Sequence, residues 1–184
     1  MEDKLLLWRL SRGSTDALKR IYDKYESYML RLAAGLLNNI GDAEDAVHDV
    51  FVTFARSVGT INIHGSLKSY LASSVLNRSR DMIRMAHSRR TVDLDNVSEP
   101  ASGDIERPDM SAICAEESRR MHRLLGRIPI EQREVIVLHL NGEMTFRQIA
   151  AMQETSINTI QSRYRYGLDK LRSLLSSEVQ DETN

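Results

Sequence analysis

Residues 144–172 read MTFRQIAAMQETSINTIQSRYRYGLDKLR, and this stretch decides the fold of the C-terminal part of the chain. Thr145 and Gln148 have the spacing of a capping box, which predicts a short helix that begins there and runs to about Gln153. Ser156 can cap a second helix that begins at Ile157. Two helices joined by such a short turn form a helix-turn-helix, whose second helix is suited to the major groove of DNA.

The second predicted helix has one apolar face and one polar face. Its apolar positions are Ile157, Ile160, Tyr164, Leu168 and Leu171. Its outward positions are Asn158, Thr159, Ser162, Arg163 and Tyr166, with Gln161 and Arg165 at the border. Amide and guanidinium groups match the edges of adenine and guanine, so this face favours DNA recognition. The same spacing also fits an ordinary helical hairpin with a solvated face, and spacing alone leaves both interpretations open.

The stretch before the helix-turn-helix is also helical in pattern. Four apolar residues recur at helical spacing there, namely Met121, Leu124, Leu125 and Ile128. Pro129 either ends that helix or opens the next one. The next helix is expected from about residue 130 to residue 140, where Asn141 and Gly142 stop it.

Residues 91–117 differ in composition from both flanks. They carry two prolines, a glycine and scattered acids with few large apolar side chains, so we expect a flexible acidic linker. Residues 91–118 hold eight acids and one arginine, whereas residues 1–90 have a net charge of +4 and residues 119–176 one of +5. Two basic blocks separated by an acidic one suit a DNA-contacting surface divided between two domains, although solvated helices also show such patterns by chance. Residues 177–184, with a net charge of −3, are expected to form a disordered tail.

The first 90 residues contain no proline and show three apolar stripes at helical spacing, which begin at Leu18, Ala43 and Leu67. Asp42 and Ser66 are candidate N-caps for the second and third of these helices. We expect three or four helices packed as one small bundle. The predicted fold class is therefore all-α, with two small helical domains joined by the flexible acidic linker.

Composition argues against several other classes of protein. The apolar runs are too short to span a bilayer, Met1 is followed by two acids, and the single Cys114 can form neither an intrachain disulfide nor a multi-cysteine metal site. The five histidines form no H-x-x-x-H pair, and the chain has no phosphate-binding loop or nucleophile elbow. We therefore expect a cytoplasmic protein that is not an enzyme and that uses no metal, cofactor or small-molecule substrate.

Three stretches of the chain carry motifs of one known family of proteins. The first, LGRIPIEQREVIVLHLNGEMTFRQIAAMQETSINTIQSRYRYGLDKLR, resembles the C-terminal domain of the extracytoplasmic-function (ECF) group of the sigma-70 family of RNA polymerase sigma factors. GDAEDAVHDVFVTFARS resembles the segment that docks on the clamp helices of the polymerase. SLKSYLASSVLNRSRDMIRMAHSRR resembles the segment that melts and reads the minus-ten element, with Asn77, Asp81 and Arg84 at the family's spacing. Three matches in the family's order are far more specific than a lone helix-turn-helix.

The resemblance implies a role for each part of the chain. Residues 1–90 resemble sigma region 2, residues 91–117 the linker, and residues 118–176 sigma region 4. The residues expected to dock on core RNA polymerase are Asp42, Glu44, Asp45, His48, Asp49 and Thr53. Those expected at the minus-ten element are Asn62, His64, Ser66, Asn77, Arg78, Arg80, Arg84, Arg89 and Arg90. Those expected at the minus-thirty-five element are Thr145, Arg147, Ser156, Asn158, Thr159, Gln161, Ser162, Arg163 and Arg165.

The implied partners are core RNA polymerase, promoter DNA and an anti-sigma factor, without direct insertion into a membrane. The chain departs from the family pattern at Glu154, where a glycine is common in the turn, and at Gln161, where a lysine is usual. If position 154 requires a positive φ, glutamate costs about 1 kcal/mol or more there. A stand-alone helix-turn-helix regulator is the alternative function, but it leaves the first 90 residues without a role.

Overall fold

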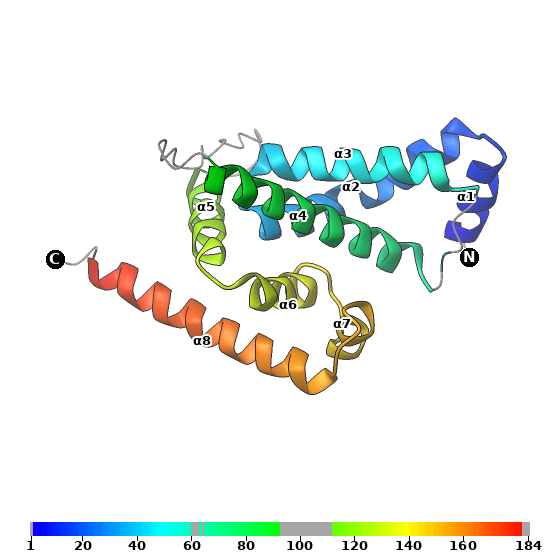
Figure 1. Cartoon of the computed structure of the whole chain (residues 1–184). Helices are drawn as coiled ribbons and strands as arrows, with labels where there is room; N and C mark the ends of the chain where they lie inside the picture. The colour runs from blue at the N-terminus through cyan, green and yellow to red at the C-terminus, as the bar shows by residue number, and fades with distance from the viewer. Residues whose placement is uncertain (1, 60–62, 64, 93–111, 182–184) are drawn as a thin grey trace. The chain divides into compact units, whose positions relative to one another are not determined.

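The computed structural model describes residues 2–59, 63, 65–92 and 112–181, of which residues 89–92, 112–116, 118 and 179–181 are described as backbone only. This part of the chain is all-α, as the sequence predicted (Figure 1). The helices are α1 (Glu2–Ser11), α2 (Thr15–Leu37), α3 (Ile40–Ser57), α4 (Leu67–Val92), α5 (Ala112–Gly126), α6 (Ile130–Leu140), α7 (Phe146–Met152) and α8 (Ile157–Asp181). The chain divides into two compact units, one of residues 1–33 and 41–100 (unit 1) and one of residues 34–40 and 101–184 (unit 2).

Unit 1 is a bundle in which the apolar stripes of the sequence form the core. All six apolar residues of the second stripe, from Ala43 to Phe54, are buried on α3. Phe51 packs against Tyr22 of α2 with ring centroids 4.7 Å apart, and Phe54 packs against Tyr70 of α4 at 6.0 Å. α3 and α4 therefore lie next to each other (Figure 1), with their polar faces turned away from the core.

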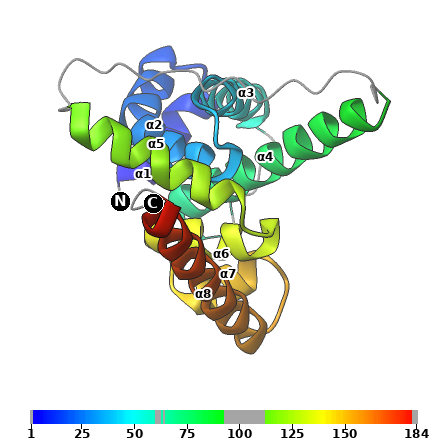
Figure 2. The same cartoon turned by 90° about the vertical axis from the view of Figure 1, so that its left-hand side faces the viewer.

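In unit 2, the long helix α8 contacts α5, α6 and α7. Both views show α6 and α7 against the first half of α8 (Figures 1 and 2). The core residues that these helices share include Leu124, Val135, Leu138, Ile149 and Ile160, each fully buried. This core fixes α7 and α8 as a helix-turn-helix on a platform made by α6.

Three of the four predicted N-caps, Ser66, Thr145 and Ser156, are confirmed by their hydrogen bonds. Thr145 accepts a hydrogen bond from the backbone of Gln148, whose side chain binds back to the backbone of Thr145, so the capping box is complete. Ser66 Oγ accepts from the backbone N of Ser69 at 3.1 Å, and Ser156 Oγ accepts from the backbone N of Thr159 at 3.0 Å. These caps satisfy backbone donors that have no partner inside the helix, which is why the helices begin there.

Three expectations about the elements differ from the structure. Asp42 lies in the first turn of α3, because the helix begins at Ile40 and not at residue 43, so Asp42 is not its N-cap. Ile157, assigned to the apolar face, is 42% exposed, since it opens α8 before the helix reaches the core. α8 continues to Asp181, into the expected tail, and Glu178 there pairs with Arg120 of α5 at 2.9 Å. The expected linker falls mainly on residues 93–111, which lie outside the described residues.

The turn of the helix-turn-helix contains a glutamate in the left-handed region. Glu154 has φ of +51°, in the conformation that favours glycine. It follows Gln153, the C-cap of α7, and the backbone N of Thr155 donates to the carbonyl of Ala150 at 3.0 Å. This is the 6→1 bond of a Schellman motif, in which the left-handed position is usually glycine. The strain anticipated for a positive φ at this residue is therefore present.

Candidate nucleic-acid interface

The polar face of α8 presents three of the expected DNA contacts to solvent. Asn158, Gln161 and Arg165 are exposed on the first three turns of the helix. Tyr166 is 56% exposed, and the guanidinium carbon of Arg165 lies 5.1 Å from the centre of its ring. Amide and guanidinium side chains on the N-terminal half of a recognition helix are the groups that read base edges in the major groove.

Three other expected contacts, Thr145, Ser156 and Thr159, use their hydroxyls within the unit. The hydroxyls of Thr145 and Ser156 cap α7 and α8. Thr159 is half-buried, and its Oγ1 lies 2.8 Å from Ser156 Oγ. Ser162 is half-buried, whereas Arg147 on α7 is exposed. Helix N-termini can present backbone N–H groups to phosphates, so the capped ends of α7 and α8 remain suited to positioning the DNA backbone.

Arg163 is half-buried and held by a side chain that the sequence did not single out. Its Nη1 donates to Gln153 Oε1 at 3.1 Å, and Gln153 Nε2 donates in turn to Glu134 Oε2 at 2.9 Å. In the sequence, Glu134 stands out as an acid inside the apolar run of α6. Its partner Gln153 is 19 residues away along the chain, and helical spacing does not relate residues that are so far apart.

A cluster of three aromatic rings joins the helices of unit 2 and was also missed. His139 of α6 stacks on Phe146 of α7 with centroids 4.5 Å apart, and Tyr164 of α8 meets His139 edge-on at 5.0 Å. Phe146 and Tyr164 lie 5.2 Å apart. His139 Nδ1 also lies 2.7 Å from the carbonyl O of Met144, which fixes the ring. Such pairs add to stability beyond their buried area, so the cluster holds α7 and α8 at a defined angle.

Arg133 lies at the junction between α5 and α6. Its Nη2 donates to the carbonyl oxygens of Gly126 and Ile128 at 2.9 and 3.2 Å. These carbonyls belong to the end of α5 and the following turn, where helical partners are lacking. Burial lowers the pKa of Arg133, and the neighbouring Glu134 carboxylate partly opposes that effect. Arg133 thus fixes the platform on which the helix-turn-helix rests.

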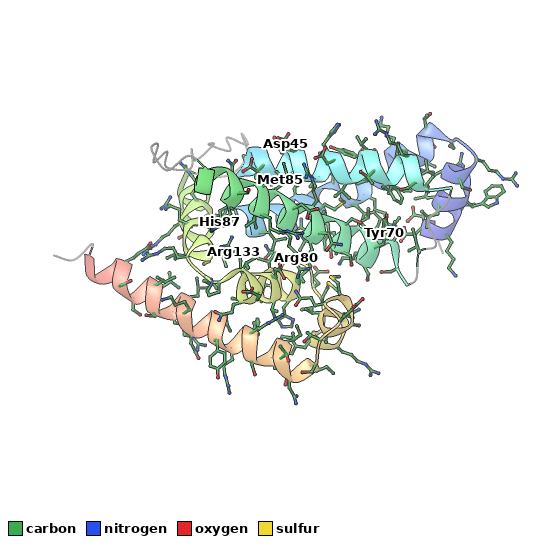
Figure 3. All side chains as sticks on the ribbon, in the orientation of Figure 1. Asp45, Tyr70, Arg80, Met85, His87 and Arg133 are labelled. Carbon is green, nitrogen blue, oxygen red and sulfur yellow. The ribbon has the colours of Figure 1, made fainter. Side chains whose placement is uncertain are left out.

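In unit 1, the residues expected to dock on a protein partner lie along one side of α3. The exposed members of this set are Asp42, Glu44, Asp45, His48 and Thr53. Asp45 projects from α3 on the side away from α4 (Figure 3). The row is acidic and hydrogen-bonding in character, which suits a basic protein surface.

Asp49, also expected in that docking set, is instead half-buried and paired. Its Oδ2 lies 2.6 Å from Arg78 Nη2 and 2.9 Å from Arg78 Nε. Arg78 was expected on the separate DNA-binding surface of α4, so the ion pair connects the two expected surfaces. The other described residues of that surface are Asn77 and Arg84, both exposed, and Arg80, half-buried. Arg84 pairs with Asp81 on the same helix.

Of the remaining expected minus-ten contacts, Ser66 alone has a described side chain. Asn62 and His64 lie outside the described residues, and Arg89 and Arg90 are described as backbone only. Ser66 is the N-cap of α4.

Among the side chains that the structure describes, no cluster of three or more His, Cys, Asp or Glu has the arrangement to hold a metal ion. Within the described helices, none is both long and apolar enough to cross a membrane.

Two family models match the chain, one in each part. The model of sigma-70 region 2 matches residues 21–89, and the model of sigma-70, region 4, matches residues 118–171. The first match contains α3 and α4 up to residue 89, with the Asp49–Arg78 pair, and the second contains α6, α7 and the first 15 residues of α8. The two matches together span most of the described chain.

Curated relatives match over nearly their whole length. The chain is 23% identical to RNA polymerase sigma-H factor of Pseudomonas aeruginosa, with 97% of each chain covered. It is 27% identical to ECF RNA polymerase sigma factor SigK of Mycobacterium ulcerans, covering 94% of this chain and 92% of the relative. It is 22% identical to ECF RNA polymerase sigma factor SigW of Bacillus subtilis, covering 91% and 93%.

Solved structures share the fold. CnrH in complex with the cytosolic domain of CnrY has a TM-score of 0.71 and 21% identity, covering 96% of this chain and 99% of that one. The sigma factor RpoE in complex with the anti-sigma factor NepR from Bartonella quintana has a TM-score of 0.67 and 22% identity, covering 86% and 98%. At this identity the likeness establishes the arrangement of helices alone.

Proposed function

The chain belongs to the sigma-70 family of RNA polymerase sigma factors, as a member of the ECF group, and on this premise we propose how its residues divide the work of initiation. As a sigma factor it binds core RNA polymerase and directs recognition of promoter DNA. We assign recognition of the minus-thirty-five element to α7 and α8 of unit 2. We assign polymerase docking to α3, and recognition and melting of the minus-ten element to α4 and the segment before it.

The single observation that carries the minus-thirty-five assignment is the exposed polar row on α8. Asn158, Gln161 and Arg165 present two amides and a guanidinium on a helix that is rigidly held by its platform. A good bidentate contact to the correct base is worth about 1–3 kcal/mol of discrimination. Two such contacts are therefore enough for a strong preference between promoters.

The assignment of unit 1 rests on the character of its two surfaces. The acidic side of α3 is suited to a basic protein partner, and the basic, amide-bearing side of α4 is suited to single-stranded DNA. Melting requires bases to leave the stack at a cost of a few kcal/mol, which a basic surface for the displaced strand helps to offset. The protein acts by binding and not by catalysis, in the cytoplasm, without a cofactor or a small-molecule substrate. We also propose an anti-sigma factor as a regulatory partner, such as NepR is for the structurally similar sigma factor RpoE in its solved complex.

The test is run-off transcription from a promoter library, with purified core RNA polymerase in the presence and absence of the full chain. Chain-dependent initiation at a restricted set of promoters is expected, and the enriched sequences should contain two conserved elements. Gln161→Ala and Asn158→Ala should change the enriched minus-thirty-five sequence. The exposed Lys170→Ala on the same helix is the control and should not change it.

Two other outcomes would contradict the assignments. If the core enzyme gains nothing while the chain alone binds duplex DNA, a stand-alone helix-turn-helix regulator is the better account. If the α8 variants change only the total yield and not the enriched sequence, the reading of bases lies elsewhere. For docking, Asp45→Lys should weaken binding to the core enzyme without altering which promoters are chosen.

A further inference from the structure

Glu134 places a carboxylate inside the core of unit 2. The residue is 2% exposed and lies on α6, after the half-buried Arg133 and before four buried apolar residues, Val135 to Leu138. A carboxylate in such surroundings is costly unless its oxygens accept hydrogen bonds. Gln153 supplies one of them, because its Nε2 donates to Glu134 Oε2 at 2.9 Å.

Both the nitrogen and the oxygen of the Gln153 side-chain amide form hydrogen bonds. While Nε2 binds Glu134, Oε1 accepts from Arg163 Nη1 at 3.1 Å. A carboxylate can only accept and a guanidinium can only donate, whereas an amide does both. Gln153 is therefore able to join Glu134 to Arg163, and the three side chains come from α6, the turn and the second turn of α8.

Arg163 keeps most of its hydrogen-bonding capacity in this arrangement. The bond to Gln153 uses one of the five N–H donors of the guanidinium. Among the described residues, Gln153 is the one acceptor bound to it. At helical spacing, Arg163 lies on the side of α8 that carries Thr159 and Tyr166, roughly 160° around the helix from Gln161 and Arg165. Tyr166 is exposed, so the guanidinium is fixed at the edge of the polar face that we assign to DNA, away from the exposed row of Asn158, Gln161 and Arg165.

We propose that Gln153 is a positioning residue for promoter recognition: anchored on Glu134, it holds Arg163 in the orientation in which Arg163 contacts the minus-thirty-five element. This inference rests on the proposed function of α8. A long side chain that must be ordered during binding loses rotamer freedom, and a side chain already held in place loses less. Gln153 itself touches no DNA, so it acts through Arg163.

A Gln153 that merely stabilises the turn predicts a different pattern of mutant effects. In that case its loss would lower the stability of unit 2 and weaken DNA binding to the same extent whether or not Arg163 is present. A positioning residue instead loses its effect once Arg163 is removed, because nothing is left to position. A double-mutant cycle separates these two possibilities.

The experiment uses holoenzyme assembled from core RNA polymerase and the full chain, with labelled duplexes that contain or lack the minus-thirty-five element. Gln153→Met keeps the length of the side chain but removes both hydrogen bonds, and it is combined with Arg163→Ala. We expect Gln153→Met to reduce the preference for the element about five- to tenfold in the otherwise unchanged chain, and less than twofold in the Arg163→Ala background. Arg120→Gln is the control, because it breaks the Arg120–Glu178 pair of the same unit at a site outside this network.

The results distinguish the inference from the function on which it rests. Equal losses in both backgrounds, or no loss on Arg163→Ala alone, overturn the positioning role. A loss of preference in Arg120→Gln as large as that in Gln153→Met overturns it as well, because general destabilisation then suffices. If the unmodified holoenzyme shows no preference for the element, the minus-thirty-five assignment of α8 fails, and the inference fails with it.

Discussion

Replacing Glu154 by glycine should stabilise unit 2. Glu154 has φ of +51° in the turn of the helix-turn-helix, and its side chain is exposed. A residue with a Cβ loses about 1–2 kcal/mol in the left-handed region, because Cβ approaches the following carbonyl oxygen. Glycine avoids that clash, so the substitution removes a local strain without removing a buried contact.

The size of the gain follows from two opposing effects. Relief of the strain favours the folded state by about 1–2 kcal/mol. The greater conformational freedom of glycine favours the unfolded state by about 0.5–1 kcal/mol, which opposes part of that gain. The net gain in the free energy of unfolding is therefore about 0.5–1 kcal/mol. For a domain of this size, 1 kcal/mol corresponds to a rise in Tm of roughly 4–8 °C, so we expect roughly 2–8 °C for unit 2.

Two measurements locate the effect. Hydrogen exchange should slow in the peptides of α6, α7 and α8, and thermal unfolding followed by circular dichroism should shift upwards. The chain has one tryptophan, Trp8 on α1 of unit 1, so its fluorescence follows unit 1 and shows whether the gain spreads beyond unit 2. The matched control is Glu154→Ala, which removes the carboxylate but keeps the Cβ and its strain. If the alanine variant gains as much as the glycine variant, the glutamate charge and not the backbone is responsible, and the reasoning is refuted.

Three further predictions concern other positions. Gly142→Ala should destabilise unit 2 by about 1–3 kcal/mol in urea denaturation, because an added Cβ would collide with the backbone carbonyl of Leu138, which cannot move aside; an unchanged midpoint would show that the end of α6 can rearrange. A double-mutant cycle on Asp49→Asn and Arg78→Gln should give a coupling of about 0.5 kcal/mol in the stability of unit 1, since both partners are partly exposed; a coupling near zero would mean that the pair is not formed in solution. Burial lowers the pKa of His122 from 6.5, so the folded state favours the neutral ring, and the stability that this provides is present above pH 6.5 and lost as the pH falls through the lowered folded pKa. His122→Gln should therefore flatten the dependence of Tm on pH below 6.5. An unchanged slope would assign that dependence to other groups.

The sequence predicted the helices because their signals are local. Apolar spacing located the core face of α3, and side-chain caps located the starts of α4, α7 and α8. The strain at Glu154 was also foreseeable, since the turn between two helices often needs a left-handed residue. The misplaced ends have equally local causes. α3 begins two residues before Asp42, and α8 runs past residue 176, because a helix can extend beyond its last clear signal when tertiary contacts such as Arg120–Glu178 hold it.

The candidate site was less predictable, because helical periodicity fixes the direction of a side chain but not its partners. Arg163 was expected on the outward face of α8, whereas the structure has it half-buried. The residue that binds it, Gln153, is ten positions away, and the Glu134 carboxylate bound to Gln153 is on another helix. Asp49 and Arg78 were assigned to separate surfaces, although they are 29 residues apart and form one ion pair. Hydrogen bonds between distant residues depend on how helices pack, which no local pattern encodes.

This distinction changes what each residue can contribute to promoter choice. The side chains of Asn158 and Gln161 are exposed, so under the proposed function the replacement of either amide should affect mainly the base that it contacts. A held side chain such as Arg163 brings its orientation from Gln153 and Glu134, so changes at those two positions should reach the DNA although neither need contact it. Arg78 presents the opposite case, because any phosphate that it binds competes with the Asp49 carboxylate on α3. If the proposed roles of α3 and α4 hold, that pair links polymerase docking to DNA binding in unit 1, because Asp49 belongs to the proposed docking set and Arg78 to the proposed DNA-binding set.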